Sequence, residues 1–223
     1  MALRFLVSGT DVGVGKTMVG CALAFAFKVR GLKTGIMKPI ETGCVERDGN
    51  LIAADAASLA AAASSDLPAH LVCQFRYRSN LAPAAAAAVD NATAPDFAAI
   101  TAAARDVMAR HQVVLIEECG GLAAPLDWQH TYMDLARSLG LEIILVLANR
   151  AGFINAAVLM ANYAARHSVR IRGLVVNALD RESSAAVQRD AEFLERATGL
   201  RCLGTVRFKE PLGLGIVEQL LVS

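Results

Sequence analysis

The sequence predicts an α/β protein with a mostly parallel, doubly wound sheet that forms a single domain over residues 1–223. Three features of the chain support this fold class. Short, continuous apolar runs recur along it, as in strands that are buried on both faces of a sheet. Segments with the apolar spacing of helices separate these runs. The chain opens with a strand, a glycine-rich loop, a helix and a second strand, which is the order of a βαβ unit with parallel strands.

The first βαβ unit is expected over residues 4–38. Its strand covers residues 5–8, and its helix begins near Met18 and ends at Gly31, a residue type that is common at helix C-termini. Apolar residues at helical spacing predict the buried face of this helix, which consists of Met18, Cys21, Ala22, Phe25 and Val29.

The remaining elements are expected to alternate in the same way. Residues 45–51 have the composition of a polar loop. Further helices are expected over residues 56–63, 84–88, 96–110, 154–167 and 190–198, and further strands over residues 113–117, 143–147, 173–177 and 203–206. No linker or internal repeat interrupts this order, so the repeated β-α units are expected to build one sheet.

Composition and charge argue against several classes of protein. No apolar run approaches the roughly 20 residues that span a bilayer, and the first residues are too few for a signal peptide. The formal net charge is +1 without a block of basic residues, which argues against nucleic acid or an anionic membrane as the main partner. The cysteines are scattered without a C-x-x-C pair, as expected for reduced thiols in a cytoplasmic protein.

Residues 9–17, Gly-Thr-Asp-Val-Gly-Val-Gly-Lys-Thr, lie between the first strand and the first helix. Glycines in such a loop let backbone N–H groups turn toward an anion, and the helix N-terminus adds further donors. Lys16 would reach the terminal phosphates of a nucleotide, and the Thr17 hydroxyl would bind Mg²⁺. Five residues separate Gly9 from Gly15, where the common pattern has four. The flanking strand and helix predict a nucleotide-binding fold of the P-loop NTPase type.

Two candidate ligand-binding residues follow the second strand. Lys38 stands at the carboxyl end of that strand, and ligands of open α/β sheets bind at this edge. An ordinary surface lysine is the alternative interpretation. Thr42, directly before Gly43, is a plausible hydroxyl ligand.

Asp55 and Glu117 are candidate Mg²⁺ ligands. Asp55 opens a helix, where an aspartate either caps backbone N–H groups or offers a carboxylate to the metal. Glu117 ends an apolar strand, which is how P-loop enzymes present a metal carboxylate, although a purely structural pair with Glu118 is the alternative. Because alternate strand residues point to opposite faces, only one of these two glutamates would face a given site. Gly120 and Gly121 would leave room for a phosphate.

Two later segments offer further polar groups. Asn177 ends a strand, where its amide would either read an adenine edge or cap a turn. The helix that begins near Ile154 exposes N–H groups that could bind a carboxylate.

Taken together, these motifs resemble the dethiobiotin synthetase family, and the resemblance covers nearly the whole chain, thinning after about Leu203. The longer loop, with five residues between its glycines, is itself a mark of that family. The motifs that carry the resemblance are residues 9–17, Lys38-Pro39-x-x-Thr42-Gly43, Asp55, Glu117-x-x-Gly120-Gly121, Gly152-x-Ile154-Asn155 and Asn177.

The resemblance implies a reaction in biotin synthesis. Members of the family convert 7,8-diaminononanoate, CO₂ and ATP to dethiobiotin, ADP and phosphate. An amine of the substrate takes up CO₂ as a carbamate, ATP phosphorylates a carbamate oxygen, and the second amine closes a cyclic urea. Mg²⁺ would be the cofactor and ATP a co-substrate. Such an enzyme must chiefly hold its reactants in line and neutralise developing charge.

The resemblance also implies roles for individual residues. Lys16 would stabilise the transferring phosphoryl group and Lys38 would bind the carbamate, so both would be catalytic. Asn177 would recognise adenine. The implied Mg²⁺ ligands are Thr17, Asp55 and Glu117. The implied nucleotide site consists of Gly13, Val14, Gly15, Lys16, Thr17, Met18, Asp55, Glu117, Gly120 and Asn177.

The implied substrate site is shared between two subunits, so a homodimer is expected. Lys38 and Thr42 would contact the substrate in one subunit. The tail carboxylate of the substrate would bind to a helix start of the partner subunit, at the positions that match Gly152, Phe153, Ile154 and Asn155.

The chain departs from the family's pattern in four places. Val12-Gly13 stands where Thr-Glu is common, so one polar contact near the phosphates is missing. Glu118 replaces a common glycine and could crowd or duplicate the Mg²⁺ carboxylate. Ala156 replaces a histidine, and Val206-Arg207 replaces an Ile-Pro pair.

Three other interpretations stay open. An amidoligase of the cobyrinate type would need a glutamine-hydrolysing domain, and no segment is spare for one. A partitioning ATPase that acts as a switch typically carries an extra lysine early in the loop, where this chain has Thr10 and Asp11. A degenerate nucleotide-binding module would keep the fold without turnover.

Overall fold

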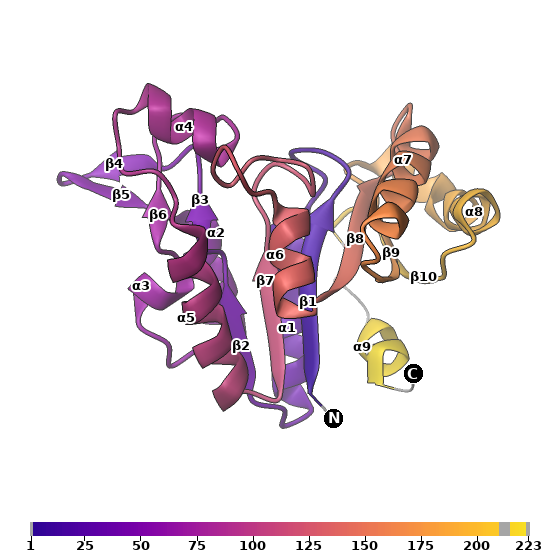
Figure 1. Cartoon of the computed structure of the whole chain (residues 1–223). Helices are drawn as coiled ribbons and strands as arrows, with labels where there is room; N and C mark the ends of the chain where they lie inside the picture. Colours follow the sequence, from indigo (N-terminus) through magenta and orange to yellow (C-terminus); the bar gives the residue numbers. More distant parts are fainter. Residues whose placement is uncertain (1, 210–214, 222–223) are drawn as a thin grey trace.

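The computed structural model describes residues 2–209 and 215–221. Its central sheet has six strands in the order β10-β9-β8-β1-β7-β2, and neighbouring strands are parallel (Figure 1). The chain starts inside the sheet, builds one side and then returns to build the other, which confirms the predicted doubly wound α/β fold. The strands are β1 (Leu3–Gly9), β2 (Thr34–Met37), β7 (Val113–Glu117), β8 (Glu142–Ala148), β9 (Ile171–Asn177) and β10 (Cys202–Val206).

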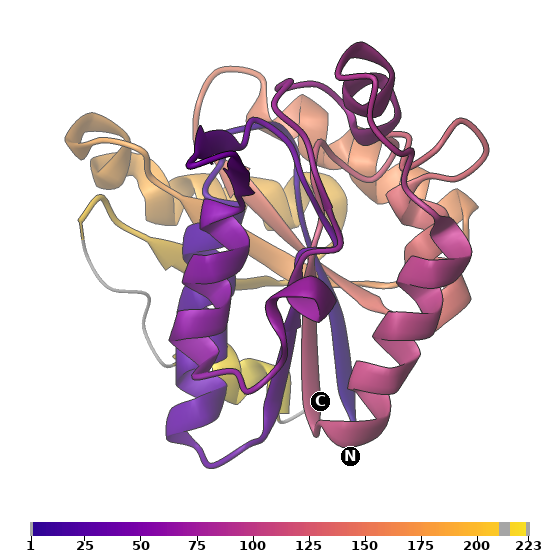
Figure 2. The same cartoon turned by 90° about the vertical axis from the view of Figure 1, so that its left-hand side faces the viewer.

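Helices cover both faces of this sheet (Figure 2). Because alternate strand residues point to opposite faces, Leu6 packs into one core, whereas Phe5 and Val7 pack into the other. The Phe5 side is covered by α1 (Lys16–Val29), α2 (Ala54–Ala63) and α9 (Gly215–Leu221). The Leu6 side is covered by α5 (Phe97–Arg110), α6 (Tyr132–Leu139), α7 (Phe153–Arg166) and α8 (Arg181–Thr198). Within the described ranges, no helix has both the length and the apolar composition needed to cross a bilayer.

The segment between β2 and α5 adds smaller elements. Two short strands, β3 (Ile40–Glu41) and β6 (Phe75–Arg76), pair in parallel, and it also contains the short helices α3 (Ala69–Val72) and α4 (Pro83–Val89). The stretch expected to be a polar loop is an antiparallel hairpin of β4 (Val45–Arg47) and β5 (Asn50–Ile52). Its two turn residues, Asp48 and Gly49, both have positive φ angles, as tight hairpin turns require.

Helices α3 and α9 were not predicted, and two further helices also differ from the sequence-based expectation. Helix α6 was not predicted, and α8 begins at Arg181 rather than near Asp190. Both begin with a reciprocal capping box. The side chain at the helix start accepts a hydrogen bond from the backbone N–H three residues later, and the side chain of that later residue accepts one from the backbone N–H at the helix start. The capping residues are Thr131 with Asp134 in α6 and Asp180 with Ser183 in α8.

The buried face of α1 is not the predicted one. Phe25 is 53% exposed, and Met18 and Val29 also lie largely in solvent. The opposite side of the helix faces the sheet, where Leu23 and Phe27 are fully buried and the ring of Phe27 stacks on Phe5. Helix α1 is apolar nearly all round, so the spacing of its apolar residues does not determine which side turns inward. The glycine loop before it and the strand contacts fix that rotation.

Two phenylalanines on α1 provide a matched test of this rotation. Phe27→Ala is expected to lower the free energy of unfolding by about 3–5 kcal/mol, because it leaves a cavity in the core. Phe25→Ala is expected to change it by less than about 1 kcal/mol, because the ring is half exposed. Urea unfolding of both variants measures the difference. Equal losses would contradict the assignment of the buried face.

Candidate active site

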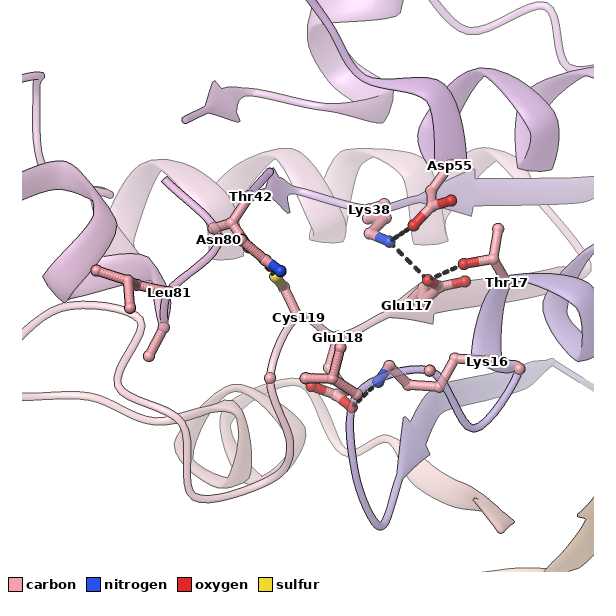
Figure 3. A pocket seen from close by; sticks show the side chains of 15 residues that line it. Lys16, Thr17, Lys38, Thr42, Asp55, Asn80, Leu81, Glu117, Glu118 and Cys119 are labelled. Carbon is pink, nitrogen blue, oxygen red and sulfur yellow. Dashed lines mark hydrogen bonds and ion pairs between the residues drawn. The ribbon is translucent and has the colours of Figure 1, made fainter. Parts of the chain in front are cut away.

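A cleft of about 590 Å³ lies at the carboxyl ends of β1, β7 and the segment that follows β2 (Figure 3). Motifs that are far apart in the sequence meet there because β7 lies between β1 and β2 in the sheet. Nine of the residues expected in the nucleotide, metal or substrate sites line this cleft: Gly13, Gly15, Lys16, Thr17, Lys38, Thr42, Asp55, Glu117 and Gly120.

The glycine-rich loop enters α1 through Gly15, which has a φ angle of 94°. A β-carbon at this position would lie 2.2 Å from Nδ2 of Asn177, so both the backbone angle and the space require glycine. The same Nδ2 donates a 2.9 Å hydrogen bond to the carbonyl oxygen of Val14. Asn177 is 3% exposed, so its side chain supports the loop from the protein interior through this hydrogen bond. Its expected contact with adenine stays a prediction.

Glu117, which is almost completely buried, is the centre of the polar contacts in the cleft. Its Oε1 accepts a 2.7 Å hydrogen bond from the Thr17 hydroxyl and a 2.8 Å ion-pair contact from Nζ of Lys38. Nζ of Lys38 also pairs with the carboxylate of Asp55. The other carboxylate oxygen of Glu117, Oε2, is buried and has no hydrogen-bond partner in the described part of the chain.

The cluster of Lys38, Asp55 and Glu117 has more carboxylates than ammonium groups. Burial alone would lower the pKa of Lys38, but Glu117 and Asp55 outweigh burial and raise it, so the ammonium stays protonated. Burial raises the pKa of Glu117 more than Lys38 lowers it. In the cluster, the one ammonium of Lys38 faces the two carboxylates of Asp55 and Glu117. The cluster therefore carries a surplus negative charge, which favours a bound cation.

Asp55 is held in place by a residue that the sequence analysis missed. The carboxylate of Glu41 accepts hydrogen bonds from the backbone N–H groups of Asp55 at 3.0 Å and Ala56 at 2.9 Å. Glu41 thus provides hydrogen-bond acceptors for free backbone N–H groups at the N-terminus of α2. The N-cap residue of this helix makes no side-chain capping hydrogen bond. The carboxylate of Asp55 faces Lys38 instead. Of the two roles left open for Asp55, the structure does not use the cap.

Glu118 faces the glycine loop rather than the Glu117 cluster. Its side chain is fully buried, and Oε1 accepts a 3.1 Å hydrogen bond from the backbone N–H of Gly9. The same oxygen lies 3.4 Å from Nζ of Lys16. Consecutive glutamates at the end of β7 therefore point toward different lysines, as strand alternation predicts. Glu118 does not crowd the carboxylate of Glu117.

The other wall of the cleft is less charged (Figure 3). The Thr42 hydroxyl lies 3.1 Å from Sγ of Cys119. Burial raises the pKa of Cys119, so its thiol stays neutral. Asn80 and Leu81, from the turn before α4, also line this wall. The sequence carries no motif at these two positions, and only the packing of α4 brings them to the cleft.

Several expected site residues lie elsewhere in the chain's own structure. Gly152 and Phe153 line a separate pocket of about 150 Å³ between the glycine loop and the start of α7. Ile154 and Asn155 line neither pocket. Met18 is 46% exposed and does not line the cleft. The roles expected for these residues stay predictions.

The polar groups of the cleft suit a metal ion that takes only some of its ligands from the protein. In residues 2–209 and 215–221, no three side chains of His, Cys, Asp or Glu form a complete metal site. Mg²⁺ commonly uses one or two carboxylates together with phosphate oxygens and water. The Thr17 hydroxyl with the carboxylates of Asp55 and Glu117 matches that ligand type, and the unpartnered Oε2 of Glu117 is an available donor.

Known proteins are similar to this chain in both sequence and fold. The sequence profile of a family described as an AAA domain matches residues 4–213. A solved structure of chloroplast FtsY from Physcomitrella patens aligns with a TM-score of 0.52 at 17% identity, over 99% of this chain and 65% of that chain, which is just under two thirds. At that identity the likeness concerns the fold alone.

Relatives with higher identity include proteins named ATP-dependent dethiobiotin synthetase BioD. One, from Anaeromyxobacter dehalogenans strain 2CP-1 / ATCC BAA-258, is 35% identical over 208 residues, which cover 93% of this chain and 87% of the relative. Another, from Anaeromyxobacter sp. strain K, is 34% identical over 192 residues, which cover 86% and 84%. This chain therefore belongs to the ATP-dependent dethiobiotin synthetase family.

Proposed function

We propose that this enzyme uses ATP and Mg²⁺ to close 7,8-diaminononanoate and CO₂ into dethiobiotin. The observation that carries the proposal is the convergence of two lysines and two carboxylates from four separate segments in one cleft: Lys16, Lys38, Asp55 and Glu117. The name of the relatives supports the substrate and the reaction. Phosphoryl transfer needs phosphate binding, a metal and a second cation for the acceptor, and the cleft has side chains suited to each task.

Thr17, Asp55 and Glu117 would hold Mg²⁺ between the protein and the nucleotide phosphates. Bound there, the ion would offset the negative charge of the phosphates during transfer. Two lysines and three carboxylates in the cleft leave one surplus negative charge, so a bound cation would favour the binding of a polyanion. With Asp55 and Glu117 as metal ligands, the ammonium of Lys38 would be available to the substrate.

The protein's part in the reaction is to position and to neutralise. One substrate amine attacks the carbon of CO₂ and loses a proton, which gives a carbamate anion that Lys38 would bind. A carbamate oxygen attacks the γ-phosphorus of ATP, ADP leaves, and Lys16 would stabilise the transferring phosphoryl group. The second amine then attacks the carbamate carbon and phosphate leaves with the bridging oxygen. Thr42 would contact the substrate beside Lys38.

The remaining contacts would come from a second subunit and from Asn177. Within one chain, the start of α7 lies outside the cleft, which supports the proposal that it serves the site of a partner in a homodimer. Its N–H groups would bind the tail carboxylate of the substrate. Asn177 would contact adenine from its place below the loop. All five cysteines are free thiols, which supports a location in the reducing cytoplasm.

The dependence of ADP release on the diamine tests the proposed reaction. With Mg-ATP and bicarbonate, the purified protein is expected to release ADP only when 7,8-diaminononanoate is present. Dethiobiotin, identified by its mass, is expected to form in equal amount. ADP release without the diamine would favour a switch ATPase. Tight nucleotide binding without turnover would favour a degenerate module and point to Val12-Gly13 as its cause.

Substitutions of the two lysines of the cleft are expected to impair different properties of the enzyme. Lys38→Met should lower dethiobiotin formation by about 10²–10³-fold with ATP affinity changed by less than about threefold, because Lys38 would contact the carbamate. Lys16→Met should lose ATP affinity itself. Lys33→Met, which removes an exposed lysine far from the cleft, is the control. If Lys38→Met lost ATP affinity as strongly as Lys16→Met, Lys38 would be a phosphate ligand.

A further inference from the structure

Glu118 is the one carboxylate of the cleft that the proposed reaction does not use. Its side chain is fully buried, yet it contacts three other residues. Oε1 accepts the 3.1 Å hydrogen bond from the Gly9 N–H and lies 3.4 Å from Nζ of Lys16, and Oε2 accepts from the Gly121 N–H. Lys16 also donates a 3.1 Å hydrogen bond to the carbonyl oxygen of Asp11.

One of these contacts is made to a group that binds phosphate in a loop of this kind. The Lys16 ammonium lies in the cleft and is a donor that would attract an anion. Glu118 places a carboxylate against this ammonium, while its contact with Gly9 is made at the end of β1. A buried carboxylate needs a counter-ion, and Lys16 is its ion-pair partner in the described part of the chain.

We propose that Glu118 is an internal competitor of the nucleotide phosphates, which pairs with Lys16 in the free enzyme and lowers the affinity of the loop for polyphosphate. The proposal rests on the phosphate-binding role proposed for Lys16. Binding of a polyphosphate draws the ammonium away from Glu118 and leaves a buried carboxylate beside the incoming anion. Both effects oppose binding, since like charges repel strongly where water is excluded. Glu118 thus sets the nucleotide affinity of this enzyme.

A purely structural role for Glu118, in which it only supports the loop, predicts the opposite change in phosphate affinity. If Glu118 served only to hold the loop in shape through Gly9 and Gly121, its replacement would loosen the loop and weaken phosphate binding. The direction of the change in affinity therefore separates competition from support.

The experiment measures the affinity of inorganic tripolyphosphate, ADP and adenosine by calorimetry without divalent cations. Glu118→Gln keeps the size of the side chain and an oxygen acceptor but removes the charge. We expect it to bind tripolyphosphate and ADP about tenfold more tightly, a difference of about 1.4 kcal/mol, and adenosine as the wild type does. Unchanged or weaker tripolyphosphate binding by a variant with the wild-type melting temperature would overturn the proposal.

Three further variants complete the design. Glu192→Gln removes one negative charge from the exposed side of α8 and is expected to leave all three affinities unchanged. Lys16→Met separates the two proposals: if it leaves tripolyphosphate binding unchanged, the phosphate-binding role of Lys16 fails. If it weakens that binding but Glu118→Gln does not strengthen it, only the inference about Glu118 fails. Glu118→Gly, with the same expected gain in affinity, decides the matter should Glu118→Gln not fold.

Discussion

The buried carboxylate of Glu117 is the contact on which the rest of the cleft depends. One of its oxygens receives the hydroxyl of Thr17 at the start of α1 and the ammonium of Lys38 after β2. Through Lys38 it also fixes the position of Asp55 at the start of α2. Residues from four segments, up to 100 positions apart in the sequence, are thereby joined. They meet at Oε1 of Glu117 or at Nζ of Lys38, which pairs with that oxygen. A buried charge of this kind is retained only when its partners are in place.

The order of strands in the sheet makes that contact possible. Strand β7 lies between β1 and β2, so the end of β7 is flanked by the glycine loop on one side and by Lys38 on the other. Alternation along the strand then sends Glu117 toward Lys38 and Glu118 toward Lys16. Each lysine is matched with at least one carboxylate, and Lys38 with two. The free cleft is therefore poised to exchange these internal partners for a metal and anionic ligands.

The sequence predicted those parts of the fold that depend on local pattern. The parallel strands, most helices and the residues of the phosphate loop follow from apolar runs, glycines and strand ends. The buried side of α1 does not, because a helix that is apolar all round has no preferred side until it packs. Helix α6 was missed although its Thr131–Asp134 capping box is a local signal. The Asp48-Gly49 turn of the β4–β5 hairpin is a second local signal of this kind.

The residues of the candidate site likewise include some that the sequence predicts and some that it does not. Lys16, Thr17, Lys38 and Glu117 stand at strand ends or at the loop, where position along the chain indicates function. Glu41 was missed because its role is to accept two N–H groups of a helix fourteen residues away. Asn80 and Leu81 reach the cleft only through the packing of the segment before α4. Such contacts depend on tertiary structure, which no spacing of residues encodes.

The transfer of a phosphoryl group to a carbamate oxygen is the central claim of this account, and the fate of that oxygen tests it most directly. The enzyme would be supplied with ATP, Mg²⁺, 7,8-diaminononanoate and freshly dissolved ¹⁸O-labelled CO₂ in ordinary water, over times shorter than the exchange of CO₂ with water. Because the bridging oxygen leaves with phosphorus when the urea closes, the account predicts one ¹⁸O atom in each phosphate released. Phosphate that carries no ¹⁸O would show that the carbamate is not phosphorylated and would contradict the proposed chemistry of the cleft.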